Sequence, residues 1–329
     1  MLDFKKVKQK IIKAKNIVIA SHINPDGDSI GSLLSLGLGV ERLGKRVYMI
    51  SADGVPKRYG FLPGADRIAR NTKRSVDLAI AVDCSNREIL GPAYNIFKKA
   101  KDILEIDHHE FKRPFGNLFL VDSKAAAVGE LVYLLLEKLK VYIDRDIAQN
   151  LLTSIIVETN SFRLPNVRPL TFEICTELIK KDVDFYKLVD MVFWSRTRES
   201  AVLSGICLAR CRFIEDGRLA WSIIRQNDFD RIKGEDEDID AVADEILSIQ
   251  GVEIVVLFRE KNKKNLRVSL RSKGRINISG IAEYYRGGGH FDIAGCTIPN
   301  TPDSIKELLT MARSLLRYSD KECINHRHR

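Results

Sequence analysis

Five short apolar runs alternate with helical or loop stretches over the first 125 residues, and this alternation restricts the possible folds more than any other feature. Each run is rich in Val, Ile and Leu and is bounded by polar residues. Continuous apolar runs of this length are typical of strands buried in a parallel sheet. With helical patterns such as 29–43 between them, they predict a doubly wound, mainly parallel α/β domain. The predicted strands are 16–20, 46–50, 78–82, 103–106 and 118–121.

The pattern becomes helical from Ala126 and mixed after about residue 210. Helices are predicted over 128–140, 145–158, 169–181, 184–192 and 198–210, because apolar residues recur there at three- and four-residue spacing. Strands are then predicted at 219–224, 254–258 and 266–270, and helices at 239–249, 279–285 and 305–316. We therefore expect a smaller mixed α/β C-terminal domain, with a cleft between the two domains.

Charge and length restrict the partners and the compartment. The 329 residues include 53 Lys and Arg against 44 Asp and Glu. The net charge of +9 fits a phosphate-bearing partner, although many basic soluble proteins carry a similar charge. No run reaches the roughly 18 apolar residues that a membrane span requires. The six cysteines are scattered, so we expect reduced thiols in a cytoplasmic protein without membrane contact.

The first polar cluster follows the strand predicted at 16–20 and precedes a helix. It places His22, Asp26 and Asp28 within seven residues. Ligands of open α/β sheets bind at the carboxyl ends of the strands, where this cluster lies. The simpler interpretation is that Asp28 or Ser29 only caps the helix, but a cap explains one residue and not all three.

Three further clusters carry acids and histidines. Asp83 follows the strand at 78–82, and Asp107, His108 and His109 follow the strand at 103–106. Glu158 ends an apolar helical stretch and, taken alone, would be a surface acid. Several carboxylates share one pocket in ionised form only if cations neutralise them. Mixed His and carboxylate ligands suit Mn²⁺, Fe²⁺, Zn²⁺ or Mg²⁺, so a site for two metal ions is favoured over coincidental caps.

The fifth cluster lies in the C-terminal part and suits a phosphate. Glycines allow close approach of a ligand to the backbone, and the alternation over 266–271 places polar side chains on one face of a strand. The alternatives are a flexible turn with a surface histidine and a solvated edge strand carrying charge. The candidate substrate-binding residues are Gly288, Gly289, His290, Arg267, Ser269 and Arg271.

These motifs, in this order, resemble the DHH phosphoesterase superfamily with its DHH-associated C-terminal domain. The arrangement is most similar to the nanoRNase/pAp phosphatase (NrnA-type) enzymes. The resemblance implies a metal-binding catalytic domain over 1–192, a linker helix over 193–210 and a substrate-binding domain over 211–329. It implies two divalent ions, Mn²⁺ first, with Mg²⁺, Fe²⁺ or Co²⁺ as alternatives.

The resemblance also implies a role for each site residue. Asp83 bridges the two ions, His109 lies near the scissile phosphate, and Asp107 orients the histidines. Glu158 stands where the family usually has Asp, which moves the carboxylate by about 1.5 Å. The implied ligands are His22, Asp26 and Asp83 for one ion, and Asp28, Asp83, His108 and Glu158 for the other.

The leading hypothesis is a metal-dependent phosphodiesterase or phosphatase that uses a hydroxide activated by two metal ions. Its expected substrates are short oligoribonucleotides, 3′-phosphoadenosine 5′-phosphate, or both. A cyclic-dinucleotide phosphodiesterase is the alternative within the same class. A non-catalytic nucleotide or RNA-binding sensor is the alternative from another class, motivated by Glu158. The expected partner is a short RNA or nucleotide, and homodimer formation stays open.

Overall fold

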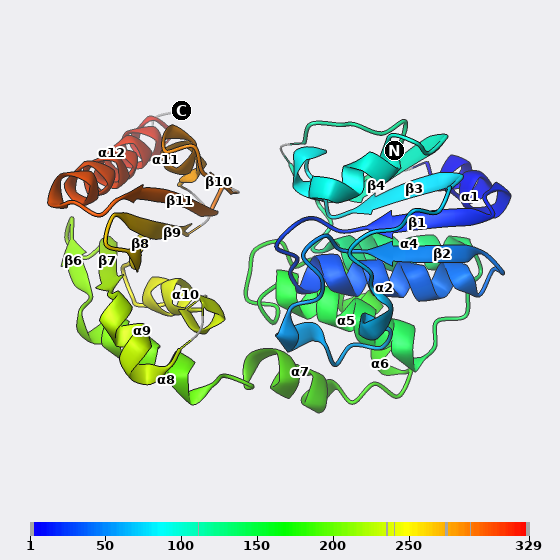
Figure 1. The fold of residues 1–329 in the computed structure, drawn as a ribbon, viewed down its shortest axis with the longest axis horizontal. Helices are drawn as coiled ribbons and strands as arrows, with labels where there is room; N and C mark the ends of the chain where they lie inside the picture. Colours follow the sequence, from blue (N-terminus) through cyan, green and yellow to red (C-terminus); the bar gives the residue numbers. More distant parts are fainter. Residues whose placement is uncertain are drawn as a thin grey trace. The chain divides into compact units, whose positions relative to one another are not determined.

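The computed structural model describes residues 3–110, 112–234, 236–239, 241–273, 276–289 and 291–326. The chain divides into two compact units, with the boundary between Ser195 and Arg196 (Figure 1). No helix in the described ranges is both long and apolar enough to cross a membrane.

The first unit is built on a five-stranded, fully parallel sheet with the order β2-β1-β3-β4-β5. The strand order reverses direction between β1 and β3, which makes this position the topological switch point where ligands bind in such sheets. The strands are β1 (Asn16–Ala20), β2 (Arg46–Ile50), β3 (Leu78–Val82), β4 (Asp102–Asp107) and β5 (Leu118–Val121).

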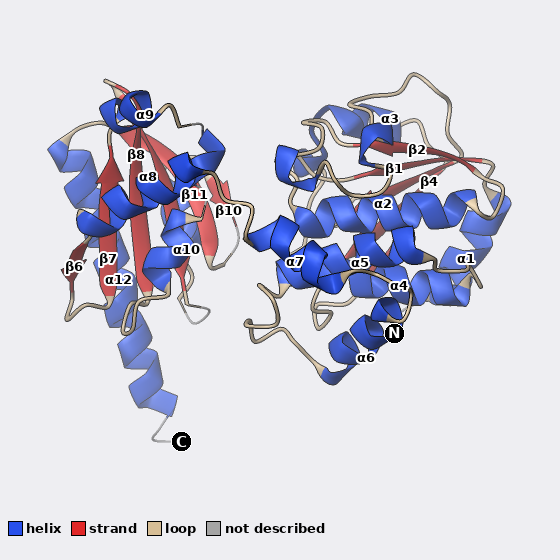
Figure 2. Ribbon diagram, turned by 90° about the horizontal axis from the view of Figure 1, so that it is seen from below, coloured by secondary structure: helices blue, strands red, loops and turns tan. Residues whose placement is uncertain are grey.

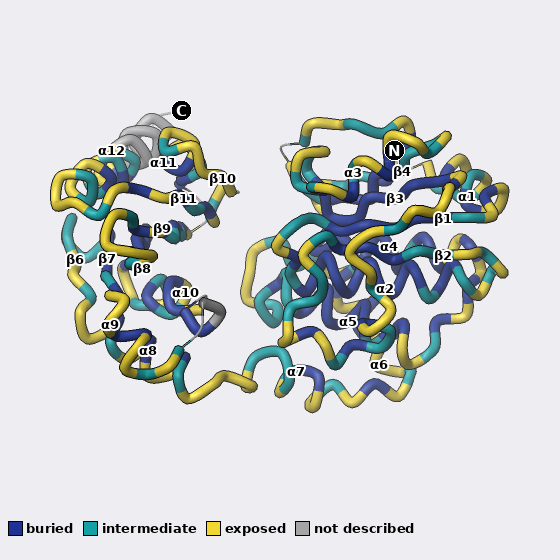
Figure 3. The backbone as a smooth tube through the Cα atoms, in the orientation of Figure 1, coloured by how far each residue is buried: buried dark blue, intermediate teal, exposed yellow. Residues whose placement is uncertain are grey.

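Helices cover both faces of this sheet. On one face, α2, α4 and α5 pack against β1 and β3 through an extended apolar core; on the other, a smaller cluster joins the sheet to η3 and α3 (Figure 3). The helices are α1 (Phe4–Lys13), α2 (Gly27–Glu41), α3 (Tyr94–Phe97), α4 (Val128–Lys138), α5 (Arg145–Glu158), α6 (Pro169–Ile179) and α7 (Phe185–Phe193). Short 3₁₀ turns are η1 (Lys57–Tyr59), η2 (Ala65–Arg67) and η3 (Glu88–Ala93).

The second unit contains a six-stranded mixed sheet with the order β10-β11-β9-β8-β7-β6 (Figure 2). Among the described strands of this unit, β7 and β8 pair in parallel and the other pairs are antiparallel. One face packs against α11 and α12, and the other against α8, α9 and α10. The strands are β6 (Arg212–Ile214), β7 (Leu219–Ile224), β8 (Ile254–Asn262), β9 (Asn265–Ser272), β10 (Gly288–Gly289) and β11 (Ile293–Pro299). The helices are α8 (Arg198–Ala209), α9 (Gln226–Ile232), η4 (Asp236–Ile239), α10 (Val242–Leu247), α11 (Ser279–Tyr284) and α12 (Pro302–His326).

The predicted fold class, a parallel α/β unit followed by a mixed α/β unit, is confirmed. The segment 193–210, expected as a linker helix, contains the end of α7 and all of α8. Leu203 and Cys207 of α8 are buried in the core of the second unit, so α8 is an integral part of that unit. The roles expected for the two domains stay predictions.

Candidate metal centre

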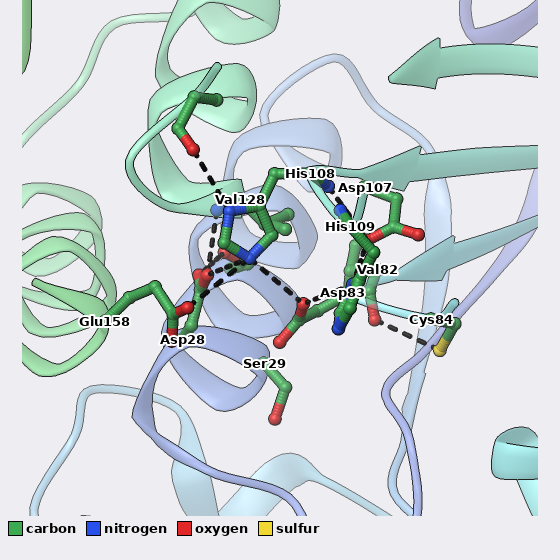
Figure 4. Close-up of polar contacts among 12 residues, drawn as sticks. Asp28, Ser29, Val82, Asp83, Cys84, Asp107, His108, His109, Val128 and Glu158 are labelled. Atoms are coloured by element: carbon green, nitrogen blue, oxygen red, sulfur yellow. Dashed lines mark hydrogen bonds and ion pairs between the residues drawn. The ribbon is translucent and has the colours of Figure 1, made fainter. Parts of the chain in front are cut away.

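The predicted site residues of the first unit meet at the carboxyl edge of its sheet (Figure 4). His22 follows β1, and Asp83 follows β3, so the two flank the switch point. Asp107 ends β4, and His108 and His109 come next in the chain. The parallel arrangement therefore gathers residues from three distant parts of the sequence at one edge.

The loop after β1 is held by a capping box at the start of α2. Asp26 is the N-cap, and not Asp28 or Ser29 as in the simpler interpretation: its Oδ1 accepts a hydrogen bond from Ser29 N at 2.9 Å. His22 Nδ1 lies 2.7 Å from the carbonyl oxygen of Ile23, so Nδ1 donates a proton there. The other ring nitrogen, Nε2, is thereby directed at Asp26 Oδ1 (3.9 Å) and Asp83 Oδ2 (3.6 Å). A hydrogen bond at one ring nitrogen is how metal-binding histidines are usually oriented.

Asp28 is fully buried within α2 and is held by α4 and α5. Its Oδ1 accepts from Ser154 Oγ at 2.6 Å and from Ser32 Oγ at 3.0 Å, and its Oδ2 accepts from Val128 N at 2.8 Å. Burial, followed by the nearby charge of Asp83, raises the pKa of Asp28 to about 7. A nearby cation would favour the ionised form of this carboxyl.

Asp83 adopts a left-handed backbone conformation, with φ of 59°, which is uncommon outside glycine and frequently found at functional sites. Its side chain is buried, and Oδ1 has no hydrogen-bond partner among the described residues. Burial alone would raise the pKa of this carboxyl, but the hydrogen bond from His22 and the charges of the three nearby histidines lower it. A buried, ionised oxygen without a donor is suited to a metal ion.

In the segment 107–109, the rings of His108 and His109 are oriented by different groups. Asp107 Oδ1 accepts from His108 N at 2.8 Å and lies 2.6 Å from His109 Nδ1, so that nitrogen donates to the carboxylate. His108 Nδ1 instead lies 3.1 Å from the carbonyl oxygen of Ala125. This leaves His108 Nε2 facing Asp28 Oδ2 and Asp83 Oδ1 at 3.8 Å each, and Glu158 Oε1 at 3.6 Å.

The donor atoms fit divalent cations. Ligand atoms that share an ion at about 2.1 Å lie roughly 3–4 Å apart, which matches the 3.6–3.9 Å separations here. Nitrogen and carboxylate oxygen together suit Mn²⁺ and similar ions. Three sets of potential ligand atoms lie within 4.8 Å of one another: His22, Asp26 and Asp83; Asp28, His108 and Glu158; and Asp83, His108 and His109. The third set would take His109 Nδ1 away from Asp107, so we favour the first two.

The sequence reasoning missed the residues that hold the ligands in place. Ser154 and the Val128 amide hold Asp28, and the buried pair Glu105 and Lys112 lies behind Asp107. Glu105 offered a signal, because it is a charged residue inside an apolar strand and must have a partner. The hydroxyl of Ser154 offered none, because serine is common in helices and its orientation depends on packing.

The candidate substrate residues of the second unit have separate environments. Arg267 and Ser269 lie on the face of β9 opposite its buried residues and line a small pocket with Arg259. Arg271 shares this face, but its Nε donates to Asp244 Oδ1 at 2.9 Å.

Gly288 and Gly289 of the fifth cluster form the short strand β10. Gly289 pairs with Ala294 of β11 and has φ of 147°, and a Cβ there would lie 2.3 Å from the carbonyl oxygen of Ile293. Close pairing therefore accounts for this glycine, whereas a Cβ at Gly288 would face open space. His290, predicted to contact substrate, lies outside the described residues.

Comparisons with known proteins identify the families that the chain matches. The DHH family, N-terminal domain, matches residues 16–155, and the DHHA1 domain matches residues 224–317. The bifunctional oligoribonuclease and PAP phosphatase NrnA of Thermus thermophilus is 30% identical over 285 residues, covering 86% of this chain and 84% of that protein.

Solved structures extend the likeness to the fold. The crystal structure of an exopolyphosphatase-related protein from Bacteroides fragilis matches with a TM-score of 0.89 at 22% identity, covering 96% of each chain. The crystal structure of exonuclease RecJ bound to manganese matches with a TM-score of 0.52 at 14% identity, covering 97% of this chain and 95% of that chain. From the extent of its identity to the Thermus protein, this chain belongs to the DHH family.

Proposed function

We propose that this chain is a metal-dependent phosphoesterase that hydrolyses short oligoribonucleotides and 3′-phosphoadenosine 5′-phosphate. The observation that carries the proposal is the pair of ligand groups beside Asp83, whose Oδ2 faces His22 and whose buried Oδ1 faces His108. The similar Thermus protein is named for both activities.

The two groups divide the proposed ligands between two ions. Mn²⁺ is the proposed metal, and Mg²⁺, Fe²⁺ or Co²⁺ are the alternatives. The manganese in the similar RecJ structure supports this choice. Such ions, when bound, supply a water of lowered pKa and positive charge beside the phosphoester oxygens. His22 and Asp26 would hold one ion, Asp28, His108 and Glu158 the other, and Asp83 both.

His109 is the proposed contact to the scissile phosphate. Its Nδ1 donates to Asp107, and Nε2, on the other side of the ring, is the nitrogen proposed to contact substrate. Asp107 is then a positioning residue: its two oxygens are occupied by protein groups. Together the two residues resemble a carboxylate–imidazole pair in which the acid fixes the orientation of the ring.

The second unit is proposed to bind the rest of the substrate. Arg267 and Ser269 offer a guanidinium and a hydroxyl beside Arg259, a combination that suits a phosphate group. Arg271 is oriented by Asp244, and the space beside Gly288 allows a ligand to approach the backbone. His290 remains a predicted contact from the sequence.

A turnover panel tests the proposal. Purified full-length protein with Mn²⁺ is assayed against linear dinucleotides, cyclic dinucleotides, longer RNA and 3′-phosphoadenosine 5′-phosphate. Asp83→Ala should lose nearly all activity, because it removes a ligand of both ions. Glu88→Ala is the matched control, since it removes the same charge from an exposed side chain five residues later.

The outcomes separate the candidate functions. Hydrolysis of linear dinucleotides and of 3′-phosphoadenosine 5′-phosphate supports the proposal. Exclusive hydrolysis of cyclic dinucleotides would replace the proposed substrate with that class. Tight binding of a short oligonucleotide without turnover, across several metals, would make the chain a sensor and refute the proposed catalysis.

A further inference from the structure

Lys112 is a nearly buried lysine behind the candidate metal centre, with 8% of its side chain exposed. Its Nζ lies 2.5 Å from Asp107 Oδ2 and 2.7 Å from Glu105 Oε2, and it donates to the carbonyl oxygen of Cys84. An ammonium group has three N–H donors, and three acceptors surround this one. Lys112 thus connects the end of β4 with the residue that follows Asp83.

The side chain of Glu105, which pairs with this lysine, is held in one position. It lies on β4, two residues before Asp107 and on the same face of the strand, and it is fully buried. Its Oε1 accepts hydrogen bonds from the backbone amides of Phe115 and Gly116. A Cβ at Gly116 would lie 3.0 Å from Oε1, so glycine allows this close approach. The backbone amides therefore hold the Glu105 carboxylate in position independently of the ammonium group of Lys112.

The Asp107 carboxylate is consequently fixed at both oxygens. Oδ2 faces Lys112, while Oδ1 accepts from the backbone of His108 and the ring of His109. Without the ammonium group, Oδ2 would be a buried anionic oxygen without a donor and the carboxylate could rotate. Rotation of the carboxylate would move the acceptor that orients the His109 ring.

We propose that Lys112 is a positioning residue that acts on His109 through Asp107, with Glu105 holding the ammonium group in place. The inference rests on the proposed function, because it assigns His109 a contact with substrate. The competing explanation is purely structural: Lys112 neutralises two buried carboxylates and has no effect on the reaction. The two explanations predict different activities for a variant in which the charges of Glu105 and Lys112 are removed together.

The test compares three variants of the full chain. Lys112→Met removes the charge but keeps most of the side-chain volume. The double variant Glu105→Gln/Lys112→Met removes both charges and retains an oxygen for the amides of Phe115 and Gly116. Lys10→Met is the matched control, because Lys10 pairs with Asp102 at the other end of β4, with 36% of its side chain exposed.

Two measurements are made on each variant once thermal unfolding has confirmed folding. Steady-state hydrolysis of a dinucleotide with saturating Mn²⁺ gives kcat and KM. In the diamagnetic Mg²⁺ form, NMR records the ring N–H proton of His109, which a hydrogen bond to a carboxylate shifts downfield. His109→Gln assigns that signal by its loss.

Lys112→Met and the double variant should both lower kcat about 10- to 100-fold, with KM changed less than twofold, and should both weaken the His109 signal. Lys10→Met should match the unmodified chain. A folded double variant with unchanged kcat and an unchanged His109 signal overturns the proposal and leaves the structural explanation. If the unmodified chain hydrolyses nothing, the proposed function fails, and the NMR measurement alone decides whether Lys112 orients His109.

Discussion

Proton release on metal binding is the sharpest quantitative consequence of the candidate centre. Burial would lower the pKa of His22, but the hydrogen bond and charge of Asp83, together with the charge of Asp26, raise it to about 9 in the metal-free protein. Burial and the charge of Asp83 raise the pKa of Asp28 to about 7. Both protons occupy groups that are proposed ligands, so each must leave when an ion binds.

The number of protons follows from these two values. At pH 8, His22 is about 90% protonated and Asp28 about 10%, so filling both sites should release about one proton from these groups. At pH 6 both are at least about 90% protonated, and the release should approach two. The site that contains His22 should lose affinity about tenfold, or 1.4 kcal/mol, for each pH unit below about 9.

Isothermal titration calorimetry with Mn²⁺ measures this release. Titrations at one pH in buffers of different ionisation enthalpy give the proton count from the slope of the heat against that enthalpy. His22→Gln is the control, and it should lower the count at pH 8 by about one. A count below about 0.3 at pH 8, or the same count at pH 6 and pH 8, would refute the assignment of His22 and Asp28 as ligands.

Three further predictions follow from the same geometry. Stabilisation by His22 is complete below its unfolded pKa of 6.5 and is lost as pH rises through about 9. Urea unfolding in chelator, compared between the unmodified chain and His22→Gln, should therefore show a contribution of His22 that is about 3 kcal/mol smaller at pH 9.5 than at pH 6, and an equal contribution at both pH values contradicts the raised pKa. Glu158→Asp withdraws a carboxylate by about 1.5 Å, so competition with a metal indicator should show roughly tenfold weaker binding of one ion; tighter binding would exclude Glu158 as a well-placed ligand. Gly31→Ala places a Cβ 2.5 Å from the carbonyl oxygen of Asn150, so α2 must move from α5 at a cost of about 1–3 kcal/mol in chemical unfolding, and unchanged stability would disprove this close packing.

The sheet of the first unit could be predicted from sequence because its strands coincide with short runs rich in Val, Ile and Leu, and the central strand β3 is buried at every residue. The predicted bounds of β1, β2, β3 and β5 agree with the structure residue for residue, since polar residues end each apolar run. The edge of the second sheet that is formed by β10 and β11 has no such apolar run. Strand β10 has only two glycines, and β11 contains Gly295 and Pro299, residues that are uncommon within strands. Strand β11 forms through pairing with β9, and β10 through pairing with β11, which local composition does not reveal.

The same distinction applies to the candidate site: the positions of some residues follow from local sequence, whereas the orientations of their side chains do not. A residue such as Asp83 could be placed at the sheet edge because its strand could be predicted, and parallel strands end at a common edge. The orientation of its carboxylate could not, because that depends on a left-handed backbone conformation at a non-glycine residue. Lys112 could not be paired with Glu105, because the path of the chain after His109 decides which buried acid an ammonium group reaches. Candidate ligands such as Asp83 could therefore be placed from strand ends, whereas the groups that orient them follow from packing alone.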